Sequence, residues 1–291
     1  MKTSGRSTYE KFWKPLLLAK LGESYKRVSA VFIWSYIKRL FSARDSSSQK
    51  EQFGYVVGGY KTVFDHLEKL LRSAGNDIRT GVSVEHIEPN PRGGLWVEHN
   101  GGREHFDKVI FTGPVNILQR IVSNDLIKVA GDRGTVEYLG VICMVLITRK
   151  PLVPYYVVNI ADQRIPFTGI IGMSSLVSLQ ETAGLNITYL PKYVLSDDPL
   201  LQQTDNELRK LFFKGLGLMF PELKTDEIVA AQINRAIKVQ PLQVLNYSTL
   251  VPKVSTENDD FFVLNTSQFV NDTLNNNTVV QHVDEFLKNF C

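Results

Sequence analysis

Three stretches of the 291-residue sequence combine residue types that could contact a ligand. The first is Tyr55-Val-Val-Gly-Gly-Tyr60, where two glycines stand between an extended segment and an amphipathic helical pattern. Because glycine has no Cβ, the backbone at Gly58 and Gly59 can approach a ligand closely. A turn without a ligand explains the same pair. The phosphate-binding pattern GxGxxG follows no expected strand of this sequence.

The second stretch runs from Ile78 to Pro114 and alternates between strand-like segments and turns. Asp107 precedes a Val-Ile-Phe-Thr run that ends at Gly113-Pro114. The acidic residue and the glycine could face a ligand at the end of a buried strand. A three-stranded meander with Asp107 in a turn explains every residue type without one.

The third stretch, Asn265 to Val280, begins as a short buried strand and continues through a polar loop into a helix. Asn275, Asn276 or Asn277 can cap that helix. The free N–H groups of a helix start favour anionic or electron-rich oxygens. A capped helix without a ligand leaves the polar run from Asn265 to Gln268 unexplained, so both interpretations stay open.

Other chemistries have no support in the residue pattern. No serine lies in a GxSxG turn, and the five histidines show no metal-ligand spacing with the two cysteines, so we expect no metal site. Two cysteines form no disulfide framework, which predicts a reducing compartment and thus a cytoplasmic protein. No apolar signal-peptide region follows Met1.

Charge is concentrated at the beginning of the chain. Residues 1–50 carry eleven Lys or Arg and three Asp or Glu, although the whole chain has a net charge of only +3. The basic residues alternate with Trp, Phe and Leu and no nucleic-acid motif accompanies them, so we expect no nucleic-acid binding. A solvated helical face explains the charge. Peripheral membrane contact is the alternative, because Val28 to Phe41 is both amphipathic and basic.

The elements that must position these stretches follow from periodicity and from Gly, Pro and Asn signals. Helices are expected over residues 9–21, 28–41, 63–73, 205–218 and 278–290. Strands are expected over residues 78–87, 95–99, 106–112, 138–148, 155–160, 168–171, 187–193, 228–239 and 261–265. Helices and strands alternate irregularly and without a repeat. The class is therefore mixed α/β or α+β, with two domains that the chain visits in turn.

An ordered set of segments resembles the flavin amine oxidase superfamily, and within it the protoporphyrinogen-oxidase-like NAD(P)/FAD-dependent oxidoreductases. The matching segments are residues 12–22, 28–34, 54–67, 84–87, 106–114, 154–162, 166–169, 189–192 and 265–280. They cover nearly the whole chain in the order of the family.

The resemblance implies a partial FAD-binding domain interleaved with a substrate domain. Residues 1–50 would form the helical part of the substrate domain, residues 51–133 and 259–291 would belong to the FAD domain, and residues 134–258 would form the substrate sheet and helix. The cofactor would be FAD, bound by Val84, Thr112, Asn265, Asn277, Thr278 and Val279. Substrate would contact Tyr55, Gly58, Gly59, Tyr155 and Tyr156.

The family begins with a strand, a GxGxxG turn and a helix that hold the pyrophosphate, and this sequence contains none of them. We therefore expect either a truncated or split chain, or a missing unit that comes from a separate GxGxxG-containing polypeptide. The expected activity is oxidation of a C–H bond in a small or amphipathic substrate. The alternative is a non-catalytic ligand-binding or partner subunit with the same fold.

Overall fold

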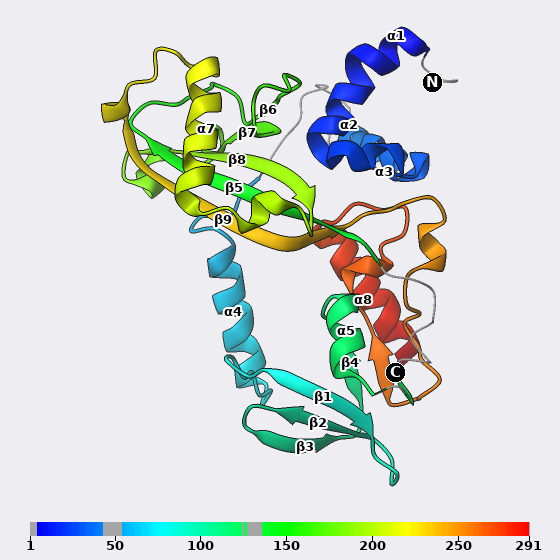
Figure 1. Ribbon diagram of the computed structural model, residues 1–291. Coiled ribbons are helices and arrows are strands. Elements are labelled where there is room, and N and C mark those ends of the chain that lie inside the picture. The colour runs from blue at the N-terminus through cyan, green and yellow to red at the C-terminus, as the bar shows by residue number, and fades with distance from the viewer. Residues whose placement is uncertain (1–4, 43–53, 124, 127–135, 291) are drawn as a thin grey trace. The chain divides into compact units, whose positions relative to one another are not determined.

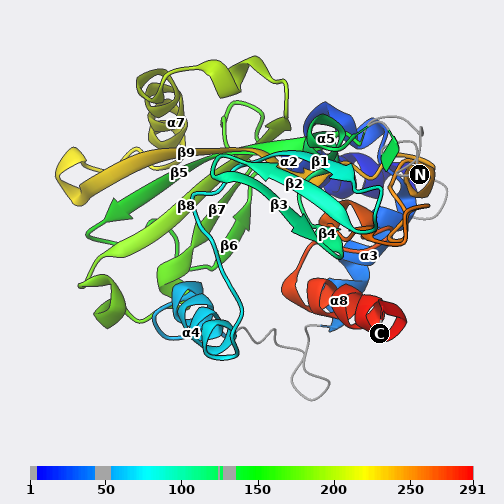
Figure 2. The ribbon, with the colours of Figure 1, turned by 90° about the horizontal axis from the view of Figure 1, so that it is seen from below.

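The computed structural model describes residues 5–42, 54–123, 125–126 and 136–290, and its mixed helices and strands confirm the predicted fold class. The chain forms two compact units (Figures 1 and 2). The first contains residues 1–27, 51–67 and 138–239, and the second contains residues 28–50, 68–137 and 240–291. Each unit is thus assembled from three separate parts of the chain.

The first unit is built on a five-stranded sheet in the order β6-β7-β8-β5-β9. Its strands are β5 (Tyr138–Thr148), β6 (Val157–Asn159), β7 (Gly169–Gly172), β8 (Asn186–Leu195) and β9 (Ile228–Pro241), the last of which ends in the second unit. Every strand predicted in this region is confirmed, with bounds shifted by a few residues. The longest ladder is antiparallel and pairs β5 with β8 from Leu139–Leu195 to Thr148–Asn186.

Helix α7 (Asp205–Met219) covers one face of this sheet (Figure 1). Leu208, Phe212 and Leu216 recur at intervals of four residues on one side of the helix, and all three are buried. They pack against alternate residues of β5, including Ile142 and Met144, because successive side chains of a strand point to opposite faces.

The N-terminal helices of the first unit are α1 (Arg6–Thr8) and α2 (Lys14–Leu21), separated by a π-helical turn over Tyr9–Trp13. Pro15 lies at the start of α2, where its missing N–H is tolerated. Helix α4 (Tyr60–Ser73) follows later and runs from the first unit into the second.

The second unit contains α3 (Ala30–Ser42), a three-stranded antiparallel sheet, a two-stranded parallel pair and two further helices. The antiparallel strands are β1 (Val84–Pro89), β2 (Leu95–His99) and β3 (Gly102–Phe106). The parallel strands are β4 (Val109–Phe111) and β10 (Phe261–Val263), and the helices are α5 (Val115–Ile121) and α8 (Asn276–Phe290).

Two sequence predictions in this unit were partly wrong. The strand expected over residues 78–87 begins only at Val84, because Asn100 holds the preceding segment as a loop. Its side-chain oxygen accepts from the Ser83 N–H at 3.2 Å and its amide donates to the Gly81 carbonyl at 3.2 Å. The strand expected over residues 106–112 is divided. Phe106 ends β3, a bend follows at Asp107, and β4 leaves the meander to pair with β10.

Both faces of the β4–β10 pair are covered within the second unit. Phe261 and Val263 are buried against Leu118 of α5 and Leu95 of β2. Phe262 points to the opposite face, where its ring centroid lies 5.7 Å from that of Phe286 in α8. The pair is therefore the middle of three layers. Helix α5 and the antiparallel sheet cover one face of the pair, and α8 covers the other.

The contact between α7 and the sheet should dominate the stability of the first unit. We expect Phe212→Ala to lower the free energy of unfolding by about 3–5 kcal/mol, because it removes a fully buried ring and leaves a cavity. Leu218→Ala on the same helix changes an exposed side chain and should stay within about 0.5 kcal/mol. Urea unfolding measures both. Equal losses in the two variants would contradict this account of the core.

Candidate functional site

The structure brings two of the predicted cofactor residues together at the carboxyl ends of β4 and β10. These strands are parallel, so both end at the same edge of the pair. Thr112 follows β4, and Asn265 follows β10 after one residue. Ligands of open parallel sheets bind outside the carboxyl ends of the strands. This edge, defined by Thr112, Gly113, Leu264 and Asn265, is the carboxyl edge.

Asn265 is buried, and its side chain joins the two strand ends. The amide Nδ2 donates to the Gly113 carbonyl at 3.0 Å, and Oδ1 accepts from the Ser267 N–H at 3.0 Å. The Asn265 N–H donates to Oε1 of Gln268 at 2.8 Å. The amide therefore shapes the carboxyl edge, whereas Thr112 is exposed there, and its contact with a ligand stays a prediction.

Gly113 is required by close packing at the same edge. A Cβ at this position would lie 2.6 Å from the ring of Phe111, and real Cβ atoms do not approach another atom so closely. The Gly113 carbonyl is thereby held in reach of Asn265.

The start of α8 is capped by Asn275, which settles which of the three asparagines is the cap. Its Oδ1 accepts from the Thr278 N–H at 3.0 Å, and its Nδ2 donates to the Thr273 carbonyl at 2.8 Å. Thr278 is buried, and its hydroxyl accepts from Asn275 Nδ2 at 3.0 Å. Asn277 and Val279 are exposed. The first turn thus presents these two residues, with the positive end of the helix dipole, to the surroundings.

Val84 lies elsewhere in the second unit. It is the first residue of β1, opposite His99 in the antiparallel sheet, and not part of the β4–β10 pair. Its side chain is exposed. The role that the resemblance implies for its backbone stays a prediction.

In the first unit, the Gly58–Gly59 turn is bound to a carboxylate. Both glycines have positive φ angles, 79° and 74°, and a Cβ at Gly58 would lie 2.6 Å from Thr62 Oγ1. The Gly58 N–H donates to Glu181 Oε2 at 3.0 Å, and the Tyr55 hydroxyl donates to Glu181 Oε1 at 2.8 Å. Glu181 thus orders the turn that the sequence indicated as a close-approach site.

Glu181 was missed because it lies more than 120 residues from its partners and belongs to a short 3-10 turn, Leu179–Thr182. A lone glutamate in a polar segment carries no sequence signal. Tyr155 and Tyr156 lie beside the beginning of β6, where the Gly172 N–H donates to the Tyr156 carbonyl at 2.8 Å. Tyr155 is exposed and Tyr156 is half-buried.

The face of the five-stranded sheet opposite α7 is a second candidate surface. The strand register places Val157, Ile171, Tyr189 and Val145 side by side across β6, β7, β8 and β5. Cys143 opposite Pro191 and Val141 opposite Tyr193 continue this face along β5 and β8. We name it the open sheet face because α7 does not cover it; it is predominantly apolar, most of its residues are half-buried, and α2 contacts β8.

Two groups of this face titrate above their ordinary range. Burial raises the pKa of the Cys143 thiol and that of the Tyr193 phenol, because the ionised forms lose hydration. Both side chains are therefore neutral at neutral pH. This face therefore offers neither a thiolate nor a general base at these two residues. The apolar run over residues 138–148 was the sequence signal for β5, and the partners on β6, β7 and β8 needed the register.

No cluster of three or more His, Cys, Asp or Glu able to hold a metal occurs within the described ranges. The helices among those residues are also too short or too polar for any to cross a membrane.

These features define a mixed α/β architecture, with a parallel strand pair in one unit and an apolar sheet face in the other. The family model for flavin containing amine oxidoreductases matches residues 5–229. The chain belongs to that family, which confirms the superfamily indicated by the sequence.

Solved structures share the fold at low sequence identity. An oxidoreductase from Methanosarcina mazei has a TM-score of 0.73 at 18% identity, covering 97% of this chain and 66% of its own. A protein assigned as protoporphyrinogen oxidase from Exiguobacterium sp. 255-15 has a TM-score of 0.65 at 12% identity, covering 94% of this chain and 63% of its own. Reduced UDP-galactopyranose mutase has a TM-score of 0.63 at 14% identity, covering 84% and 55%.

The chain therefore spans about 55 to 66% of the length of these three structures. No curated protein sequence matches it significantly.

The capping assignment can be tested on neighbouring residues of the same type. We expect Asn275→Ala to lower the free energy of unfolding by about 1 kcal/mol, because the capping bond from the Thr278 N–H and the bond to the preceding Thr273 carbonyl are lost. Asn277→Ala should cost much less, since Asn277 is exposed and its side chain makes none of the capping bonds. Urea unfolding compares the variants. A larger loss at Asn277 would reassign the cap.

The Glu181 contacts predict a local effect at the glycine turn. In Glu181→Gln the Gly58 amide should exchange its hydrogen about tenfold faster, because the charge-assisted bond is lost. Gln180→Ala alters a neighbouring exposed side chain and should leave that rate unchanged. Hydrogen exchange followed by NMR gives both rates. An unchanged Gly58 rate in Glu181→Gln would show that the carboxylate does not order the turn.

Proposed function

We propose that this chain is the cofactor-completing and substrate-facing part of a FAD-dependent oxidoreductase that oxidises a C–H bond of an apolar or amphipathic substrate. The observation that carries the proposal is the carboxyl edge of β4 and β10 in a chain of the flavin containing amine oxidoreductase family. The apolar character of the open sheet face supports the substrate class.

The described residues fit one part of such a cofactor. The exposed Thr112 stands at the carboxyl edge, and the first turn of α8 presents Asn277 and Val279, where the helix dipole favours an electron-rich carbonyl. Asn265 holds the edge through Gly113. FAD supplies the hydride-accepting chemistry when bound. The residues of this chain would hold its flavin end and exclude water from the apolar substrate surface.

The glycine-rich loop that binds a pyrophosphate is not among the 291 residues. We propose that it belongs to a βαβ unit supplied by residues outside this sequence, for example by a separate polypeptide. A third or more of each matched structure has no counterpart in this chain, which leaves room for such a unit.

The free edge of β4 supports this partner. In the parallel pair, the Val109 N–H donates to the Asp260 carbonyl at 2.8 Å and the Phe111 carbonyl accepts from Leu264 at 2.9 Å. Alternation therefore directs the N–H and carbonyl of Ile110 to the other edge, where no described strand pairs with β4. Two-stranded parallel sheets covered on both faces are rare, because parallel sheets are normally larger. A further strand would pair at Ile110.

Helix α4 gives independent support. Tyr60, Val63, Phe64, Leu67 and Leu71 recur at helical spacing on one side of α4, and all are exposed. A helix of this pattern gains most of its stability by covering its apolar side. An additional α/β unit would provide that cover.

The proposal predicts that cofactor binding requires both polypeptides. The chain alone, mixed with FAD and passed through gel filtration, should emerge colourless. Co-expression with the part of the Methanosarcina mazei oxidoreductase that has no counterpart here should give a retained flavin absorbance band. Ile110→Pro should abolish that band, because it removes the outward N–H while leaving the bonds to β10 intact.

The thermal unfolding temperature of Ile110→Pro alone is the control for folding. A flavin band in the chain alone would show that the partner is unnecessary. No band in any combination would leave the non-catalytic ligand-binding or partner subunit as the better account. If the wild type and Ile110→Pro both retain the flavin band, the edge of β4 does not pair with the partner.

A further inference from the structure

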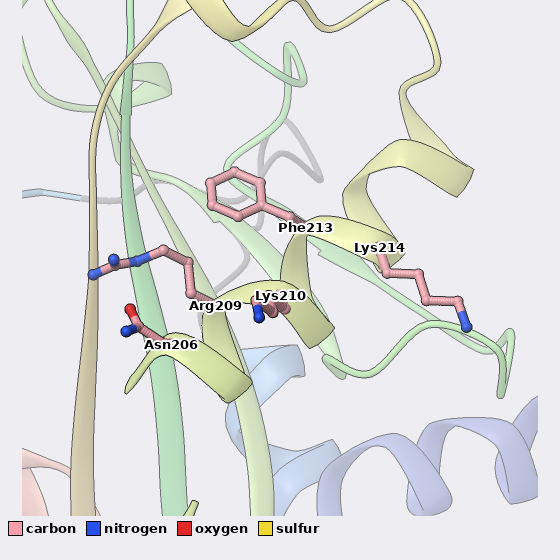
Figure 3. Close-up of a pocket in the computed structure, with 5 residues that line it drawn as sticks. All are labelled: Asn206, Arg209, Lys210, Phe213 and Lys214. Carbon is pink, nitrogen blue, oxygen red and sulfur yellow. The ribbon is translucent and has the colours of Figure 1, made fainter. Parts of the chain in front are cut away.

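Helix α7 carries a cationic hollow on the side that faces away from the buried core. Asn206, Arg209, Lys210, Phe213 and Lys214 line it (Figure 3), and we name these five residues the α7 stripe. Their spacings of three and four residues place them on neighbouring turns of one helix face. The stripe therefore gathers three cations beside one aromatic ring.

Both acidic residues of the first turn of α7 accept hydrogen bonds from groups outside the stripe, although Glu207 also interacts electrostatically with Lys210. Asp205 Oδ1 accepts from Arg235 at 2.6 Å. Glu207 Oε2 accepts from the Thr204 N–H at 2.8 Å and from its hydroxyl at 2.7 Å, as the cap of the helix requires. Both carboxylates are thus occupied by structural contacts. Within the described ranges, Arg209, Lys210 and Lys214 form no ion pair.

Arg209 is the least satisfied member of the stripe. Its Nε is buried and has no hydrogen-bond partner among the described residues. A buried donor without an acceptor is destabilising and uncommon in folded proteins. Figure 3 shows the Arg209 and Asn206 side chains directed to the same side of α7. A guanidinium fork and a neighbouring amide together suit the oxygens of an oxyanion.

We propose that the α7 stripe binds the phosphate group of a small organic ligand, with Arg209 donating to its oxygens and Lys210 adding charge. A phosphate monoester carries up to two negative charges, which matches a site with three cations better than a single carboxylate does. Phe213 provides an apolar surface for the organic part. This site lies wholly within the first unit and is independent of the proposed flavin chemistry.

Phenyl phosphate is the probe for this site. NMR of the arginine side chains in the full chain should show the Arg209 Nε–H resonance moving with saturation as phenyl phosphate is added. The Arg235 resonance is the internal control and should stay in place, because Arg235 already donates to Asp205 and to the Gln203 carbonyl. Benzoate should bind more weakly than phenyl phosphate.

Substitutions make the test specific. Arg209→Gln and Lys210→Gln should each weaken phenyl phosphate binding about tenfold, since each removes a charge-assisted contact. Lys150→Gln is the matched control, because Lys150 is an exposed lysine of the same unit paired with Glu227 at 2.6 Å. It should leave binding unchanged. Equal binding by all four proteins, or no saturable shift at Arg209, would overturn the proposal.

A lipid headgroup is the other source of the same phosphate chemistry. Vesicles containing phosphatidic acid should not retain the protein in a flotation assay. Retention by vesicles without any response to phenyl phosphate would overturn a small-ligand site in favour of a membrane surface.

Discussion

The parallel pairing of β4 with β10 is the constraint on which the arrangement of this chain depends. Val109–Phe111 and Phe261–Val263 are adjacent in space but about 150 residues apart in sequence. Parallel neighbours need a long crossover connection, and here that connection contains β5, α7 and β9. The sheet and α7 of the first unit are therefore inserted between two strands of the second unit, and the second unit is completed only after the chain returns.

That pairing also determines the chemistry available at the carboxyl edge. Asn265 reaches Gly113 only because both strands end at the same level. Its amide is consumed in holding the two chain segments, which leaves Thr112 and the start of α8 to meet a ligand. Asn265, which looked most like a ligand group in the polar run of the sequence, thus positions other residues. The groups that face outward are harder to recognise in the sequence.

Carboxylates in this protein are repeatedly used to shape backbone. Glu181 binds the Gly58 N–H, Glu207 closes the cap of α7 and Asn275 performs the equivalent task for α8. Such contacts fix turns at modest energetic gain, because a buried or ordered N–H must find an acceptor. Their secondary effect is electrostatic. These hydrogen bonds leave the charge of the carboxylates in place, and Glu207 interacts electrostatically with Lys210 of the α7 stripe.

The sequence by itself determined the elements and the family. The apolar run of residues 138–148, the pattern of residues 205–218 and the Asn-rich start of the last helix gave the correct element type, because these patterns reflect local geometry. An ordered set of short motifs gave the superfamily. Where local hydrogen bonds competed, as Asn100 does before β1, the predicted strand was too long.

Only the tertiary structure decided which distant residues meet. Three contacts join segments that lie tens to more than a hundred residues apart in the sequence. They are the pairing of β4 with β10, the bonds of Glu181 to Gly58 and Tyr55, and the cross-strand row through Tyr189. The local propensity of a segment does not predict which distant segment it pairs with. These pairings arise because buried edges, apolar faces and backbone donors must each find a partner, and the partner that is found depends on the packing of the whole unit.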